Sequence, residues 1–185
     1  MTANVEDTAQ ALDHFLAATE KRAYRMALIA TGNSEEALDV VQDAMLKLVR
    51  KYAKRSAEEW PLLFHRILQN TLNDWYRKQK VRYGLMRWFG YVDKDAEEVE
   101  TVEQLPQTRS YHPDERLGQE RAMLTLEKAL SDLPMRQQQA FLLRQWEGLD
   151  VANTARAMGI SEGSVKTHYS RAIHSLRNQL EDHWS

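Results

Sequence analysis

The sequence contains no cysteine, few glycines and prolines, and no long run of apolar residues. Without cysteine there is no disulfide and no thiolate-ligated metal site, and such a composition suits a reducing compartment. No apolar run reaches the ~20 residues that a membrane-spanning helix needs, and the polar, acidic start MTANVEDTAQ is unlike a signal peptide. These absences predict a soluble, cytoplasmic protein with no membrane insertion of its own.

Period-two alternation is also scarce, and with only 7 Gly and 4 Pro in 185 residues this predicts an all-helical chain. A hydrophobic content of 43% is enough for one large domain or two small ones. The net charge is only −2, so the chain is not a general polycation. Any affinity for nucleic acid must therefore come from local basic patches.

The stretch from Gly148 to Leu180 has the pattern of two helices joined by a short turn. Asp150 and Ser161 are candidate N-caps, and Gly159 between them suits a turn that other residues adopt at a cost. The second helix places one set of apolar residues on a single face: Val165, Tyr169, Ala172, Leu176 and Leu180. Its outer face is polar and basic, with candidate DNA-binding residues Lys166, Thr167, Ser170 and Arg171. A DNA-binding helix-turn-helix is predicted, and an ordinary helical hairpin is the alternative.

The N-terminal half predicts helices over about 9–31 and 34–52, with Asn33 and Glu36 forming a capping box between them. The second of these helices is expected to bury Leu38, Val41, Met45 and Leu48. Its opposite face then carries Asp39, Gln42, Asp43 and Leu46, an acidic stripe with one apolar residue. Such a stripe is either a partner-binding surface or a solvated face.

A polar loop over Lys51–Glu59 leads to a third helix, from Trp60-Pro61 to Trp75. From Trp75 to Val92 there are five Lys/Arg and no acid. Cations interleaved with aromatics suit stacking on unpaired bases beside phosphates, and a basic helix end with core aromatics is the alternative. The aromatic segment Leu85–Val92 is apolar enough to dock on the first domain or on a partner.

Asp93–Glu103 holds six acids against one Lys, and two prolines follow, which predicts a flexible acidic linker over 93–114. Further helices are expected up to Leu133-Pro134 and over 135–146. The predicted organisation is therefore two small helical domains, 1–92 and 115–185, with the helix-turn-helix in the second.

Three motifs in this order resemble the extracytoplasmic-function (ECF) group of sigma-70 family RNA polymerase sigma factors. ALDVVQDAMLKL resembles the helix that binds core polymerase, and WPLLFHRILQNTLNDWYRKQK resembles the helix that melts and reads the minus-ten element. LPMRQQQAFLLRQWEGLDVANTARAMGISEGSVKTHYSRAIHSLR resembles the domain that reads the minus-thirty-five element. The resemblance covers nearly the whole chain outside the linker.

The resemblance implies a role for each group of residues. The face of Asp39, Gln42, Asp43 and Leu46 would bind the clamp helices of the polymerase's largest subunit. The minus-ten element would be captured and held by Phe64, Asn70, Asp74, Arg77, Lys78 and Lys80. The minus-thirty-five element would be read by Lys166, Thr167, Ser170 and Arg171. The implied partners are core RNA polymerase, including its flap, promoter DNA and an anti-sigma protein.

The chain departs from the family pattern at two places. Ala152 and Asn153 stand where the first helix of the helix-turn-helix often has paired acids, and the loop after Tyr52 is short. Two other classes also fit parts of the chain. A LuxR/NarL-type regulator shares the end SVKTHYSRAIHSL, but such a protein needs an α/β receiver ahead of it, and residues 1–90 show no strand pattern. A sigma-mimicking interaction protein would not need the basic segment. The six His have no metal-ligand spacing and no catalytic constellation is present, so neither an enzyme, a metal nor a cofactor is expected.

Overall fold

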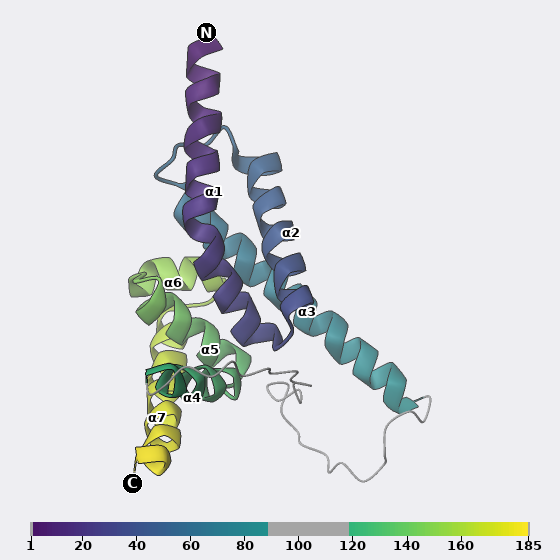
Figure 1. Ribbon diagram of the computed structural model, residues 1–185, viewed down its shortest axis with the longest axis vertical. Helices are drawn as coiled ribbons and strands as arrows, with labels where there is room; N and C mark the ends of the chain where they lie inside the picture. Colours follow the sequence, from purple (N-terminus) through teal and green to yellow (C-terminus); the bar gives the residue numbers. More distant parts are fainter. Residues whose placement is uncertain (1, 89–118, 185) are drawn as a thin grey trace.

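The computed structural model describes the backbone of residues 2–88 and 119–184, and the side chains of residues 7–82 and 123–180. Within these ranges the chain is helical and contains no strand, so the predicted all-α fold is confirmed. An N-terminal unit consists of α1 (Thr2–Thr31), α2 (Ser34–Tyr52) and α3 (Trp60–Trp88) (Figure 1). A C-terminal unit consists of α4 (Gln119–Ser131), α5 (Met135–Phe141), the π-helical turn η1 (Leu142–Trp146), α6 (Val151–Met158) and α7 (Glu162–Trp184). The predicted acidic linker, 93–114, lies outside the described residues.

The first junction, between α1 and α2, is closed by Asn33. Its side-chain oxygen accepts hydrogen bonds from the backbone N–H groups of Glu35 at 2.9 Å and Glu36 at 3.1 Å, which confirms the predicted N-cap. The reciprocal half of the predicted capping box was wrong. Instead of turning back to Asn33, the Glu36 carboxylate accepts a 2.6 Å hydrogen bond from the indole N–H of Trp75 on α3. A half-buried indole needs an acceptor, and α2 supplies it.

The core of the N-terminal unit forms where α1, α2 and α3 meet, around the fully buried side chains of Met26, Leu48, Phe64 and Leu68. The face of α2 that enters this core is centred on small residues, Ala37 and Ala44, which let the helices approach closely. Leu38 is one residue round the helix from Ala37 and therefore points outward, 47% exposed, contrary to the prediction that it is buried.

The third helix is longer than predicted. It does not end at Trp75 but continues to Trp88, so the basic residues after Trp75 lie on the same helix. The extension has a simple cause: residues 77–80 are Arg, Lys, Gln and Lys, all good helix formers, and no proline interrupts them.

In the C-terminal unit the helix predicted over 135–146 changes its winding part of the way along. α5 ends at Phe141, and η1 follows with wider turns, closed by a 3.1 Å bond from the Glu147 N–H to the Leu142 carbonyl. Gly148, with φ +67°, then reverses the chain in a backbone conformation that favours glycine. The wider turn brings Arg144 and Gln145 against α7.

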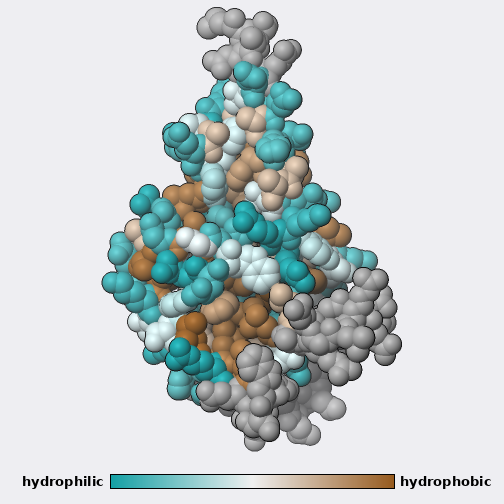
Figure 2. Space-filling model, turned by 60° about the vertical axis from the view of Figure 1, so that its left-hand side comes forward, coloured by the Kyte–Doolittle hydropathy of each residue, from teal (hydrophilic) through white to brown (hydrophobic). Residues whose placement is uncertain are grey.

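The two units pack against each other, α3 on α6 and α1 on α4 (Figure 1). The surface of the molecule is mixed: on the face in Figure 2, hydrophilic residues surround separate hydrophobic areas, the largest of them in the lower half. None of the described helices is long and apolar enough to cross a membrane.

Candidate nucleic-acid and protein interfaces

The exposed face of α2 carries the four residues expected to bind polymerase. Asp39, Gln42, Asp43 and Leu46 are all exposed, Leu46 by 51%, because the buried face of the same helix is occupied by Val40, Val41, Ala44 and Leu48. Asp43 is held by Lys47, whose Nζ lies 2.7 Å from Asp43 Oδ2 and also donates to the Thr71 hydroxyl at 3.2 Å. The stripe therefore combines carboxylates with an apolar side chain that is half exposed to solvent.

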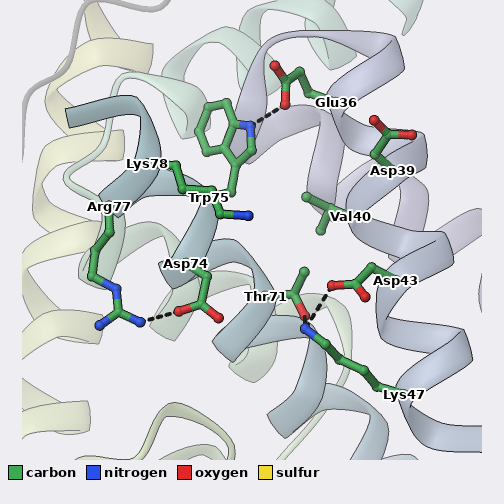
Figure 3. Close-up of a pocket in the computed structure, with 10 residues that line it drawn as sticks. All are labelled: Glu36, Asp39, Val40, Asp43, Lys47, Thr71, Asp74, Trp75, Arg77 and Lys78. Atoms are coloured by element: carbon green, nitrogen blue, oxygen red, sulfur yellow. Dashed lines mark hydrogen bonds and ion pairs between the residues drawn. The ribbon is translucent and has the colours of Figure 1, made fainter. Parts of the chain in front are cut away.

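Beside this face, α2 and α3 enclose a groove of about 490 Å³ (Figure 3). Its lining comes from both helices: Glu36, Asp39, Val40, Asp43, Lys47, Thr71, Asp74, Trp75, Arg77 and Lys78. One wall is mainly acidic and the other carries two cations. Residues expected to bind polymerase and residues expected to hold DNA thus share one groove. Sequence reasoning did not place Glu36, Lys47 and Thr71 there, since contacts between helices leave no short-range pattern.

On α3, five of the six residues expected at the minus-ten element lie together on the surface. Asn70, Arg77, Lys78 and Lys80 are exposed, and Asp74 is half-exposed and paired with Arg77. In this pair the charges of Asp74 and Arg77 cancel, and Lys78 and Lys80 beyond them keep the helix end cationic.

Phe64, the sixth, is not brought to that surface. It is fully buried, with its ring centroid 6.2 Å from Phe15 and 5.9 Å from His65. It shares its helix face with Leu68 and Leu72, four and eight residues on, and that face is turned into the core. The expectation that Phe64 lines a base pocket is therefore corrected: its ring is part of the core.

The aromatics Trp75 and Tyr76 are used for packing between helices. The Tyr76 hydroxyl donates a 2.9 Å hydrogen bond to the Ala30 carbonyl on α1, and burial raises the pKa of this phenol. The Trp75 ring stands edge-on to Tyr76 at 5.1 Å and donates its N–H to Glu36. Of the two interpretations of the basic aromatic segment, packing between helices describes Trp75 and Tyr76, whereas the cations that follow them are exposed.

The helix-turn-helix is built as predicted. Asp150 caps α6 by accepting from the Asn153 N–H at 2.6 Å, Gly159 ends it at φ +67°, and Ser161 caps α7 by accepting from the Ser164 N–H at 3.1 Å. The side-chain amide of Asn153 donates to Asp150 as well, at 3.2 Å, so this departure from the family pattern strengthens the cap. Ala155 and Val165 are buried where the two helices meet.

The outer face of α7 presents Lys166, Thr167, Ser170 and Arg171, all exposed. Tyr169 points to the flank instead, where Phe141 stacks on its ring at 6.4 Å and the Arg144 guanidinium lies 5.8 Å from its centroid. Gln145 donates to its hydroxyl. α7 is therefore anchored on both its core face and one flank, while no described residue covers its outer face.

No group of three or more His, Asp or Glu that could hold a metal ion occurs among the described residues. The geometry defines a helical protein with one acidic-apolar helix face, one basic helix end and one exposed helix-turn-helix.

Comparison with known proteins gives the family. Residues 13–82 match the family model described as Sigma-70 region 2, and residues 123–176 match the one described as Sigma-70, region 4. The RNA polymerase sigma-E factor of Streptomyces antibioticus is 31% identical over 150 residues, which cover 79% of this chain and 71% of that protein. The RNA polymerase sigma factor SigV of Bacillus subtilis is 30% identical over 158 residues, 85% of this chain and 83% of that protein.

Solved structures agree in fold. One is the sigma factor RpoE in complex with the anti-sigma factor NepR from Bartonella quintana, with a TM-score of 0.62, 20% identity and 98% of each chain covered. Another is CnrH in complex with the cytosolic domain of CnrY, with a TM-score of 0.61, 17% identity and 95% coverage of each chain.

This chain belongs to the ECF group of sigma-70 family RNA polymerase sigma factors. It is accordingly a non-enzymatic subunit that directs transcription initiation by RNA polymerase. The N-terminal unit is its region 2 and the C-terminal unit its region 4. Membership also excludes the LuxR/NarL alternative, whose receiver domain needs strands that the described residues lack.

Proposed function

We propose that this sigma factor binds core polymerase through α2, reads and melts the minus-ten element with α3, and reads the minus-thirty-five element with α7. The observation that supports it most is that each of these helices has an exposed face of suitable chemistry inside a matched family region. The functional domains are 1–92 and 115–185, joined by 93–114. The protein works in the cytoplasm, where polymerase and promoters meet.

The polymerase contact is the face of Asp39, Gln42, Asp43 and Leu46, which takes the clamp helices of the largest subunit. Leu46 loses its exposure on binding, and the two carboxylates pair with basic side chains of the partner. Region 4 makes a second contact, with the polymerase flap. Because the clamp face adjoins the groove with Asp74 and Arg77, polymerase and promoter DNA meet on neighbouring surfaces.

At the minus-ten element, flipping a base costs a few kcal/mol of stacking, and polar groups must then satisfy its edges. Asn70 and Asp74 supply such groups on the exposed side of α3. Arg77, Lys78 and Lys80 lie one to three turns further along and hold phosphates, which adds affinity without sequence choice. Phe64 is not included, since its ring is buried.

At the minus-thirty-five element, α7 enters the major groove with Lys166, Thr167, Ser170 and Arg171. A guanidinium in the groove bonds both acceptors of a guanine, which is worth roughly 1–3 kcal/mol of discrimination. The Thr167 hydroxyl donates to the Gly163 carbonyl at 3.1 Å in the free protein, so it must give up or share this bond to donate to a base.

An anti-sigma protein is proposed as a further partner. Two solved proteins of the same fold are complexes, one with the anti-sigma factor NepR and one with the cytosolic domain of CnrY. The exposed α2 face and the groove beside it give such a partner a surface that polymerase also needs. Pull-down from native cells should recover a stoichiometric second protein besides polymerase; recovery with polymerase alone would contradict this part of the proposal.

Permanganate footprinting tests the promoter function directly, because permanganate oxidises unpaired thymines. With core polymerase and this protein together, thymines just upstream of a start site should become reactive, and with either component alone they should not. If the combination opens no DNA in a library of genomic fragments, the proposed function is wrong.

A further inference from the structure

The contact between region 2 and region 4 is unusual because a carboxylate is buried in it. Glu147 follows η1 in region 4, and its side chain is only 3% exposed. Its two side-chain partners both come from region 2: His65 Nε2 on α3 lies 3.2 Å from Glu147 Oε2, and the Arg22 guanidinium on α1 lies 3.8 Å from it. Within the described residues, Glu147 makes no side-chain ion pair inside its own unit.

Further polar contacts surround this one. Gln139 donates to Asn73 across the interface at 3.0 Å, and Gln138 reaches the Ile29 carbonyl at 3.5 Å. At the rim, Arg25 Nε lies 2.8 Å from Glu127 Oε1, with the arginine side chain 49% exposed. Polar groups therefore cross this interface at several points beside its apolar contacts, and interfaces between domains of one chain are commonly of this mixed kind.

The interface is also incompletely satisfied. His65 Nδ1, Gln139 Oε1 and Glu147 Oε1 are buried without a hydrogen-bond partner among the described residues. Each such atom costs free energy that it would recover in water. These atoms make the closed arrangement less stable than a fully hydrogen-bonded interface of the same size would be.

Opening is required by the proposed function. The two promoter elements are about 25 base pairs apart, or roughly 85 Å at 3.4 Å per pair. α6 packs directly on α3, and α7 packs on α6, which places the recognition helix about 20 Å from the α3 axis at typical helix spacings. Even the full length of α3, 29 residues or roughly 43 Å, does not make up the difference.

We propose that free region 2 and region 4 are latched together by the Glu147 carboxylate seated between His65 and Arg22, and that this closed form competes with promoter binding. The competition with promoter binding rests on the proposed function, whereas the contact of Glu147 with His65 and Arg22 does not depend on it. Closing also covers His65, Gln69 and Asn73 on one face of α3, next to the exposed Asn70.

The latch is tested by energy transfer between dyes on A18C and R156C, one in each unit, both at exposed positions. The chain has no cysteine of its own, so these are the only labelled sites. E147Q keeps the shape of the side chain and removes its charge, and the closed-to-open ratio should fall by at least roughly tenfold. The matched control is E59Q, which loses the exposed pair with Arg55 in region 2 and should leave the ratio unchanged.

Circular dichroism must show the same helix content in all variants, and E147D, which keeps the charge, should retain at least part of the closed population. Wild-type transfer efficiency in E147Q would overturn the latch. So would an equal loss of transfer in E59Q, because the effect would then not belong to Glu147.

Competition with promoter binding is tested by holding the closed form. R25C and E127C place two thiols at the rim, where the native side chains touch, and a cleavable dimaleimide can join them. The joined protein should initiate at least tenfold less than the same protein after the linker is cleaved. Equal initiation in the two states would overturn the competition. If neither state initiates, the proposed function has failed, and the dye measurement still decides the latch.

Discussion

Reversing the two carboxylates of the α2 face, Asp39→Arg with Asp43→Arg, should separate binding from folding. Both residues are exposed, so no buried contact is lost. The cost to folding comes from the Asp43–Lys47 pair, which is 2.7 Å long and spans i to i+4 on a helix surface. Such a pair is worth about 0.3–0.5 kcal/mol, and a like-charge pair in its place costs a similar amount. The total is about 1 kcal/mol, or a drop in Tm of roughly 2–4 °C for a chain of this length.

The effect on polymerase binding should be much larger. Like charges forced together at an interface cost several kcal/mol, and 2–4 kcal/mol is a loss of affinity of roughly 30- to 1,000-fold. The assay is a titration of labelled sigma factor with purified core polymerase, alongside thermal unfolding of the same samples. Asp13→Arg with Glu20→Arg, at two exposed positions of α1, is the control of equal charge change and should bind core like the wild type. If the double variant also binds like the wild type, Asp39 and Asp43 belong to a solvated face.

Three further predictions concern other parts of the chain. Arg171→Ala should cost roughly 1–3 kcal/mol of discrimination at one position of the upstream element, whereas Arg77→Ala should weaken binding to all promoters alike and reduce its salt dependence. Selection from randomised promoters measures both effects. A uniform loss of binding for Arg171→Ala would make that residue a phosphate contact. Gly159→Ala puts a side chain at φ +67° with no atom within 4 Å of its Cβ, so backbone strain alone should lower stability by about 1–2 kcal/mol, and an unchanged Tm would refute this. Burial raises the pKa of Glu147, but hydrogen bonding to His65 and the charges of His65 and Arg22 outweigh it and hold the pKa below its ordinary 4.5. The carboxylate's contribution to closure is therefore complete above pH 4.5 and is lost as the pH falls through the lowered pKa of the closed form. Dye transfer in the wild type should show this acid transition, and dye transfer in E147Q should lack it.

Local chemistry predicted the helix-turn-helix well. Asp150, Gly159 and Ser161 act on neighbours no more than four residues away, so their roles follow from residue type and spacing. The same is true of the exposed stripe on α2, because a helix that buries Val41 and Leu48 must turn Asp39 and Gln42 outward.

Contacts between helices were not predictable in this way. Glu36 had the right spacing for a capping box, but the Trp75 indole, 39 residues away, offered a better-placed donor. Phe64 matched a family position by sequence, but its place in the core depends on Phe15 of another helix. Glu147 gave no signal at all, since the two partners that make it a buried group lie in the other unit.

The central claim is that this chain gives core polymerase its choice of promoter, and sequencing of start sites measures it most directly. Purified core, with and without this protein, transcribes a library of genomic fragments, and the 5′ ends of the transcripts are mapped. With the protein, starts should concentrate at sites that share two upstream elements about 25 base pairs apart, and Arg171→Ala should relax only the more distant one. Starts that are no more concentrated with the protein than with core alone would contradict the claim.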